Sequence, residues 1–138
     1  MRSYIITTDG SYSSATKLGG WAYVLESEGM GDVVGYGPGG KGFDGNHGGS
    51  NAMELVAVLN GLSNVPRRSS VVVRTDSTYV IGGVERIDYQ RGSKWERLRH
   101  LLRSRTVTFI KVGGGGDDKH AIAHRLAGYA RRLPRFTY

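Results

Sequence analysis

Three strand-like runs follow one another before the first helix-like run, and this order restricts the fold of the chain more than any other feature. The runs cover residues 3–8, 21–25 and 32–37, and each combines β-branched or aromatic residues with flanking glycine or turn residues. The connection over 26–31 is short, so the second and third runs are expected to form an antiparallel hairpin. Three consecutive strands therefore predict an antiparallel meander on one side of a sheet.

The rest of the chain alternates between helix-like and strand-like runs. A helix is predicted over 52–59, ending near Gly61 and capped by Ser50, because apolar residues recur there at helical spacing. The further expected elements are a strand over 70–75, a helix over 78–84 that stops at Gly82-Gly83, a helix over 94–103, a strand over 106–112 and a helix over 120–132. The order β-β-β-α-β-α-α-β-α predicts an α/β fold with a five-stranded mixed sheet flanked by helices. No linker-like segment interrupts it, so residues 1–138 are expected to form a single domain.

The charge and composition narrow the class of partner. The chain has 19 Lys and Arg residues against 12 Asp and Glu residues, a net charge of +7. This excess suits a polyanion such as a nucleic acid, although a solvated basic surface that keeps a small protein soluble is the alternative. The absence of cysteine excludes disulfides and thiolate metal sites. No apolar run approaches the roughly 20 residues of a spanning helix, and the run after Met1 is too short for a signal peptide. We expect a cytoplasmic monomer with no membrane partner.

Three acidic residues stand at predicted element ends. Asp9 ends the first strand, Asp76 follows the 70–75 strand, and Glu54 lies in the first turns of the intervening helix. If the two strands are parallel neighbours, both aspartates leave the same carboxyl edge, where ligand sites of open α/β sheets lie. Clustered carboxylates need cations, and hard oxygen ligands suit Mg²⁺ or Mn²⁺. Two such ions can activate water for phosphodiester hydrolysis. Taken singly, each acid could instead be a turn residue or a helix-terminal residue.

Motifs around these acids resemble the type 1 ribonuclease H family over essentially the whole chain. The motifs are Thr8-Asp9-Gly10-Ser11, Asn51-Ala52-Met53-Glu54-Leu55 and Thr75-Asp76-Ser77, with weaker similarity at Gly19-Gly20-Trp21-Ala22, Trp95 and Leu126-Ala127. The resemblance implies the ribonuclease H fold and hydrolysis of the RNA strand of RNA/DNA hybrids, which leaves 5′-phosphate and 3′-hydroxyl ends. It also implies a two-metal-ion mechanism, with two Mg²⁺ or Mn²⁺ ions held by Asp9, Glu54 and Asp76.

The last helix departs from the family pattern. His124 stands where the family has a fourth acid, and we expect it to complete the catalytic and metal-binding set. Imidazole prefers softer metals than Mg²⁺, so the alternative is an exposed histidine without a metal. His120 shares the face of His124 at four-residue spacing, but no third ligand for a zinc site is evident from the sequence. In the preceding loop, Asp117 or Asp118 either approaches the second metal or, as we favour, caps the helix.

The same resemblance suggests which residues contact the substrate. The expected contacts to the hybrid are Gly10, Ser11, Ser50, Asn51 and Ser77. The 2′-hydroxyl is the group that distinguishes RNA from DNA at such contacts. The family's long basic insertion is absent, and a reduced set of phosphate contacts is expected from Arg86, Arg91, Lys94, Arg97 and Arg99. Trp95 is expected in the core, because Leu98 and Leu102 share its helical face.

Two other functions remain open from the sequence. A catalytically impaired module of the same fold that only binds hybrids or double-stranded RNA would explain His124 and the loop that lacks the family's histidine. A superfamily nuclease that acts on structured DNA is the other alternative. Retention of Asp9, Glu54 and Asp76 favours an enzyme, because a module that only binds phosphates has no use for clustered negative charge.

Overall fold

The computed structural model describes residues 1–40, 49–113 and 117–134, and its centre is one five-stranded mixed sheet. The strands are β1 (Ser3–Ser13), β2 (Leu18–Ser27), β3 (Val33–Gly40), β4 (Ser70–Thr75) and β5 (Thr106–Lys111). They lie in the order β3-β2-β1-β4-β5. The pairs β1/β2 and β2/β3 are antiparallel, whereas β1/β4 and β4/β5 are parallel. The predicted meander, mixed sheet and element order are confirmed.

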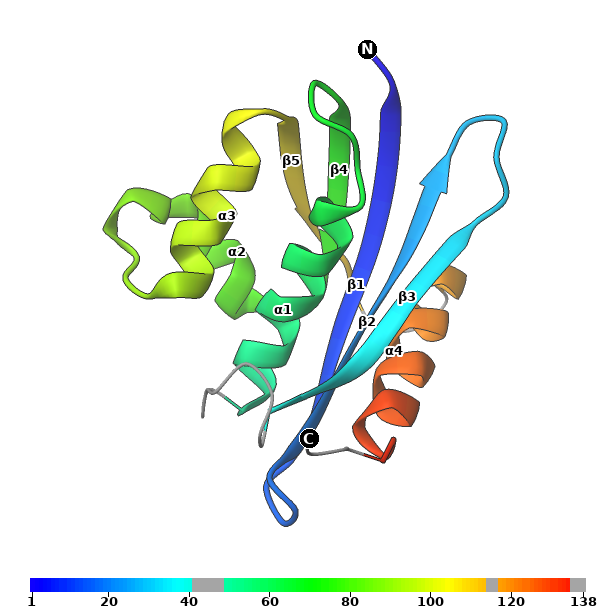
Figure 1. Cartoon of the computed structure of the whole chain (residues 1–138), viewed down its shortest axis with the longest axis vertical. Helices are drawn as coiled ribbons and strands as arrows, with labels where there is room; N and C mark the ends of the chain where they lie inside the picture. Colours follow the sequence, from blue (N-terminus) through cyan, green and yellow to red (C-terminus); the bar gives the residue numbers. More distant parts are fainter. Residues whose placement is uncertain (41–48, 114–116, 135–138) are drawn as a thin grey trace.

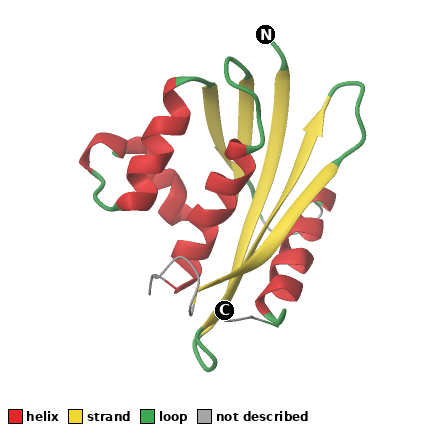
Figure 2. Ribbon diagram, viewed as in Figure 1, coloured by secondary structure: helices red, strands yellow, loops and turns green. Residues whose placement is uncertain are grey.

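Helices cover the two faces of the sheet unequally (Figures 1 and 2). They are α1 (Gly49–Ser63), α2 (Thr78–Glu85), α3 (Ser93–Arg103) and α4 (Asp118–Arg131), with a short 3₁₀ turn at Ile87–Tyr89. Two adjacent glycines of β2 show the two layers, because successive residues of a strand point to opposite faces. A Cβ atom on Gly19 would meet Met53 of α1, and one on Gly20 would meet Ala127 of α4. Helix α1 therefore packs on one face and α4 on the other.

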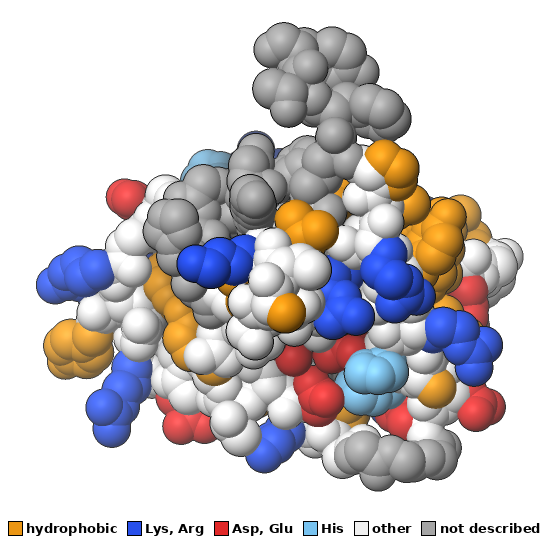
Figure 3. All heavy atoms as spheres, turned by 90° about the horizontal axis from the view of Figure 1, so that it is seen from below, with side chains coloured by type: hydrophobic (Ala, Val, Ile, Leu, Met, Phe, Trp, Pro, Cys, Tyr) orange, Lys and Arg blue, Asp and Glu red, His pale blue; other side chains and the backbone are white. Residues whose placement is uncertain are grey.

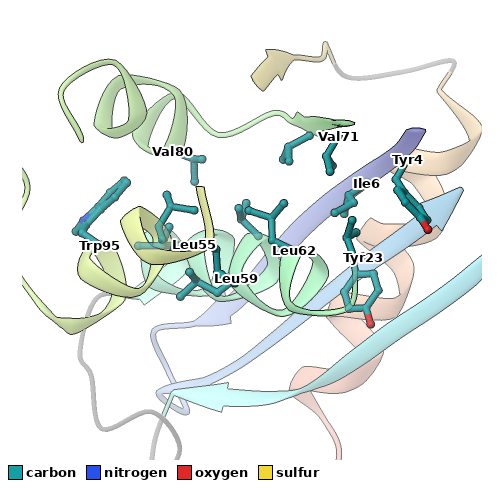
Figure 4. Close-up of a cluster of buried hydrophobic side chains, with 14 residues drawn as sticks. Tyr4, Ile6, Tyr23, Leu55, Leu59, Leu62, Val71, Val80 and Trp95 are labelled. Atoms are coloured by element: carbon teal, nitrogen blue, oxygen red, sulfur yellow. The ribbon is translucent and has the colours of Figure 1, made fainter. Parts of the chain in front are cut away.

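The main core lies between α1 and the sheet, as Figure 4 shows. Ile6 of β1, Leu55 and Leu62 of α1, and Val71 of β4 are all buried there. Alternate residues of β4 are buried, as expected of a strand whose other side chains face the opposite layer. Trp95 closes the end of the core near α3, and its Nε1 donates a hydrogen bond to the Tyr79 hydroxyl (3.2 Å). The expectation that Trp95 is a core residue is confirmed.

Several predicted boundaries are wrong at glycine-containing positions. Strand β1 continues through Asp9-Gly10 to Ser13, α1 continues past Gly61 to Ser63, and α2 continues through Gly82-Gly83 to Glu85. Gly83 has a packing role, since a Cβ atom there would lie 2.1 Å from the Trp95 ring. Close approach, not helix termination, explains this glycine.

Arg99 does not project for phosphate contact, because its Nη1 donates to the carbonyl oxygens of Ile87 (2.7 Å) and Gln90 (3.0 Å). It braces the 3₁₀ turn against α3.

Among the helices of the described residues, none has the length and apolar character that crossing a membrane requires.

Candidate active site

Asp9 lies where β1 separates from β4. The parallel pairing of these strands ends at Thr7↔Arg74, whereas β1 stays paired with β2 as far as Ser13. Asp9 comes two residues after the last parallel pair, and it is only 3% exposed. The prediction that Asp9 ends its strand is therefore wrong, because β1 continues to Ser13. Asp9 does stand just past the end of the parallel pairing. The separation of the strands gives its carboxylate access to groups from both faces of the sheet.

Asp76 follows β4 directly and faces the same place. The next residue, Ser77, caps α2: its hydroxyl accepts the Val80 N–H (3.1 Å), and its own N–H donates to the Thr75 hydroxyl (3.1 Å). Because Ser77 supplies the cap, the alternative interpretation of Asp76 as a helix cap is wrong. The Asp76 carboxylate is left free to approach Asp9, and its negative charge helps to raise the pKa of Asp9.

Glu54 reaches the site because Gly10 lets α1 come close to β1. A Cβ atom on Gly10 would lie 2.5 Å from the Glu54 nitrogen and 2.6 Å from the Met53 carbonyl carbon, so no larger residue fits in this arrangement. The backbone of Gly10 also hydrogen-bonds the Glu54 carboxylate. Within the described residues, the buried Oε1 atom of Glu54 has no hydrogen-bond partner. A buried polar oxygen without a partner is costly, which indicates that a group outside the chain satisfies it.

The electrostatics of the three acids agree with a cation site. Burial raises the pKa of Glu54 to about 9, with further contributions from the charges of Asp9 and Asp76. Burial also raises the pKa of Asp9, although its hydrogen bond with His124 opposes the shift. Without a cation, the cluster avoids like-charge repulsion by holding protons. Divalent cations fit this set, because they would neutralise the carboxylates and satisfy the orphaned oxygen of Glu54.

Helix α4 adds two histidines from the other face of the sheet. Nδ1 of His124 and Oδ2 of Asp9 share a hydrogen bond (2.8 Å), while the His124 side chain is 75% exposed. Nε2 of His120 lies 3.1 Å from Oδ2 of Asp76 and 3.9 Å from Oδ1 of Asp9, and its side chain is only 11% exposed. Ligand atoms of Asp9, Asp76 and His120 all lie within 4.8 Å of one another. His124 thus borders the site, and His120 lies deeper inside it.

His120 has no role that the sequence alone predicts, and its four-residue spacing from His124 is the only clue there. In the structure His120 is grouped with Asp9 and Asp76, and His124 is not part of that group of candidate ligands among the described residues. Viewed from below the orientation of Figure 1, acidic and histidine side chains gather in one patch with basic side chains beside it (Figure 3).

The start of α4 is fixed by a charged network. Oδ1 of Asp117 accepts the His120 N–H (3.1 Å), which confirms the predicted helix cap. The guanidinium group of Arg74 forms an ion pair with the Asp117 carboxylate and also donates to the Thr7 hydroxyl (3.0 Å). The neighbouring Asp118 is exposed at the first position of the helix. The backbone of His120 is therefore tied to β4 and β1, the strands that carry Asp76 and Asp9.

The predicted substrate residues surround this centre in different settings. Ser50 is not the helix cap that was predicted, because α1 already begins at Gly49, and Ser50 is exposed in its first turn. Asn51 is also exposed there and lines a groove of about 310 Å³ between α1 and α3, with Lys94 and Arg91 on the opposite wall. Ser11 is half-buried beyond Asp9 on β1.

Comparisons with known proteins agree with this geometry. The family model described as RNase H matches residues 1–118, which ends at the first residue of α4. A protein named ribonuclease H from Oleidesulfovibrio alaskensis (strain ATCC BAA-1058 / DSM 17464 / G20) is 33% identical over 150 residues, covering 96% of this chain and 93% of its own.

Two solved structures share the fold at 19% sequence identity. LC11-RNase H1 in complex with an RNA/DNA hybrid has a TM-score of 0.70, covering 93% of this chain and 96% of its own. LC9-RNase H1, described as a type 1 RNase H with the type 2 active-site motif, has a TM-score of 0.77, covering 95% of this chain and 72% of its own. With a family match over most of its length and three acids gathered at the carboxyl edge of its sheet, this chain belongs to the ribonuclease H family.

Proposed function

We propose that this protein is an endoribonuclease that hydrolyses the RNA strand of RNA/DNA hybrids and leaves 5′-phosphate and 3′-hydroxyl ends. The observation that carries the proposal is the convergence of Asp9, Glu54 and Asp76. The pKa values of Asp9 and Glu54 are raised, and Oε1 of Glu54 is buried without a hydrogen-bond partner within the described residues. Bound cations would relieve both conditions. Membership of the ribonuclease H family supports the same reaction. A module that merely bound nucleic acid would gain nothing from buried acids beside the phosphates.

The residues of the site have different positions and different proposed roles. Oδ1 of Asp9 faces His120 and Oδ2 of Asp9 faces His124, so this one carboxylate lies between the two histidines. Glu54 and Asp76 complete the acidic wall, and His124 stands at the exposed mouth. Two Mg²⁺ or Mn²⁺ ions held here would polarise the attacking water and neutralise the charge that develops on the phosphate. We assign metal binding and catalysis to Asp9, Glu54, Asp76 and His124.

Substrate contact is proposed for the rims of the site. Gly10, Ser11, Ser50 and Asn51 would meet the RNA strand, where contact with 2′-hydroxyls selects RNA. The contact predicted for Ser77 is not part of this proposal, because Ser77 is buried and its hydroxyl caps α2. Lys94 and Arg91 line the groove beside Asn51 and would hold phosphates without reading sequence. The net charge of +7 supports binding of a polyanion.

The test is a cleavage assay on a hybrid whose two strands carry different labels, with a labelled branched DNA in parallel, in Mg²⁺ and separately in Mn²⁺. We expect cleavage of the RNA strand alone, with products ending in 5′-phosphate. The variant Asp76→Asn should lose at least about a hundredfold in kcat, because it removes several kcal/mol of charge stabilisation. Binding of the hybrid without cleavage in either metal would favour the impaired module. Preferential cleavage of branched DNA over the hybrid would favour a structure-specific nuclease.

A further inference from the structure

His120 is a buried polar group at the centre of the site that the proposed reaction leaves without a role. Its Nε2 atom is buried and has no hydrogen-bond partner within the described residues. Oδ2 of Asp76 lies 3.1 Å away, at ion-pair distance for a protonated imidazole, yet no hydrogen bond joins the two atoms. An unpaired nitrogen in such a place indicates that it binds something other than the neighbouring carboxylates.

The distances around Nε2 suit ligands that share one ion. Two ligand atoms each about 2.1 Å from an ion, at right angles, lie about 3 Å apart. The 3.1 Å between Nε2 and Oδ2 of Asp76 agrees with this spacing, and the 3.9 Å to Oδ1 of Asp9 corresponds to a wider angle at the same ion. The three residues come from α4, the end of β4 and β1, and a ligand atom of each lies within 4.8 Å of the other two.

The fold also holds His120 in place before any ion arrives. The Asp117 cap fixes the backbone of His120, and Arg74 ties Asp117 to the strands that carry Asp76 and Asp9. Supporting contacts of this kind orient metal ligands and raise metal affinity. His124 lacks such support, because its side chain is three-quarters exposed and contacts Asp9 alone among the acids.

We propose that Nε2 of His120 is a direct ligand of the ion held between Asp9 and Asp76. This inference rests on the proposed function, because it takes the three acids to be the metal centre. A nitrogen ligand changes the chemistry of the centre, since imidazole suits later transition metals better than Mg²⁺. The protein should therefore bind Mn²⁺ more tightly than Mg²⁺, and His120 should be the cause.

The test measures metal binding without nucleic acid. The full chain is loaded with less than one equivalent of Mn²⁺, and electron spin-echo envelope modulation detects ¹⁴N coupled to the tightest-bound ion. We expect the coupling in the wild type and in His124→Ala, and its absence in His120→Ala. Titration followed by electron paramagnetic resonance should show Mn²⁺ binding weakened about tenfold or more in His120→Ala, with Mg²⁺ binding changed much less.

Two further variants keep the result interpretable. His120→Leu keeps a side chain of similar bulk without a nitrogen atom and serves if His120→Ala does not fold, while His100→Ala removes an exposed histidine of α3 as a control. Persistence of the coupling in both His120 variants, or its absence in the wild type, would overturn the inference. If the wild type shows the coupling yet cleaves no hybrid, the proposed function fails and the ligand assignment stands. If the wild type cleaves the hybrid without showing the coupling, the proposed function stands and the ligand assignment fails.

Discussion

The ionisation of Glu54 depends on what occupies the site, because its carboxyl group is buried beside Asp9 and Asp76. Its pKa of about 9 in the folded chain exceeds the ordinary value of 4.5. Between these two values the folded chain holds a proton that the unfolded chain has lost, so the free energy of unfolding falls as pH rises through this window.

The first prediction concerns this pH dependence. In a chelator, urea unfolding at pH 5 and pH 8 should show the wild type losing stability with rising pH, and Glu54→Gln losing less. At pH 8 the melting temperature of the variant should be a few degrees above that of the wild type. A gain of about 1 kcal/mol in the free energy of unfolding gives a shift of this size in a domain of this length. Mn²⁺ should abolish the fall in the wild type, because bound cations favour the ionised carboxylate. Equal pH dependence in both proteins would refute the protonated state of Glu54.

The acids of the site could be predicted from the sequence, whereas His120 could not. Asp9, Glu54 and Asp76 lie in short motifs whose backbone settings are local: a strand, a helix turn and the residue after a buried strand. The depth of His120 depends on how α4 is rotated against β1 and β4. That rotation depends on contacts between residues far apart in sequence, such as Ala127 against Gly20 and Arg74 with Asp117. No local pattern reports such a contact.

At the scale of elements, the N-terminus of α4 is predicted to control the metal centre. Asp117→Ala removes both the cap of His120 and the partner of Arg74, so unfolding should become easier by about 1 kcal/mol. Mn²⁺ binding should weaken as well, because the first turn of α4 then holds His120 less firmly. Calorimetry with and without Mn²⁺ measures both effects. Asp118→Ala is the matched control, and an effect as large in that variant would show that first-turn charge matters more than the cap.

The contact between α1 and β1 carries a second prediction at this scale. Gly10→Ala would place a methyl group 2.5 Å from the Glu54 nitrogen, so α1 must move away from Asp9. We expect a loss of about 1–3 kcal/mol of stability, typical of overpacking, and a lower kcat. Gly31→Ala is the control, because a Cβ atom there meets nothing within 4 Å. If Gly10→Ala matches the control in melting temperature and kcat, the close approach is not needed.

Most elements follow from local patterns, and the exceptions share a physical cause. The strand over 70–75 agrees with β4 because a short run of β-branched residues between turn residues favours an extended strand. Strand β1 runs beyond the Asp9-Gly10 turn signal because β2 continues to pair with it. Helix α2 runs through two glycines because tertiary packing against Trp95 outweighs their low helix propensity. Partners distant in sequence thus override local preferences.

At the scale of the whole molecule, we predict that binding of the hybrid depends on where the positive charges lie and not only on their number. Lys94 and Arg97 line a groove of about 500 Å³ between α3, α1 and the β2–β3 hairpin. Replacing both with alanine should weaken hybrid binding in a chelator and lower the salt dependence by about one unit per lost phosphate contact. Binding measured between about 50 and 200 mM salt tests this.

The matched control for that prediction removes the same charge elsewhere. Arg67 and Arg103 line a separate hollow beside the amino ends of β4 and β5, away from the carboxyl edge. Their double alanine variant should leave both the affinity for hybrid and the salt slope nearly unchanged. An equal effect from this pair would mean that net charge, and not the groove, determines binding.

The separation of β1 from β4 beyond Thr7 has a consequence for how this protein could diversify. It opens the sheet so that α1 delivers Glu54 from one layer and α4 delivers His120 and His124 from the other. The acids belong to the sheet and α1, while the two histidines proposed as ligands belong to one helix, α4. Substitutions at two positions of α4 could therefore retune the metal preference of the centre and leave the scaffold and its three carboxylates intact.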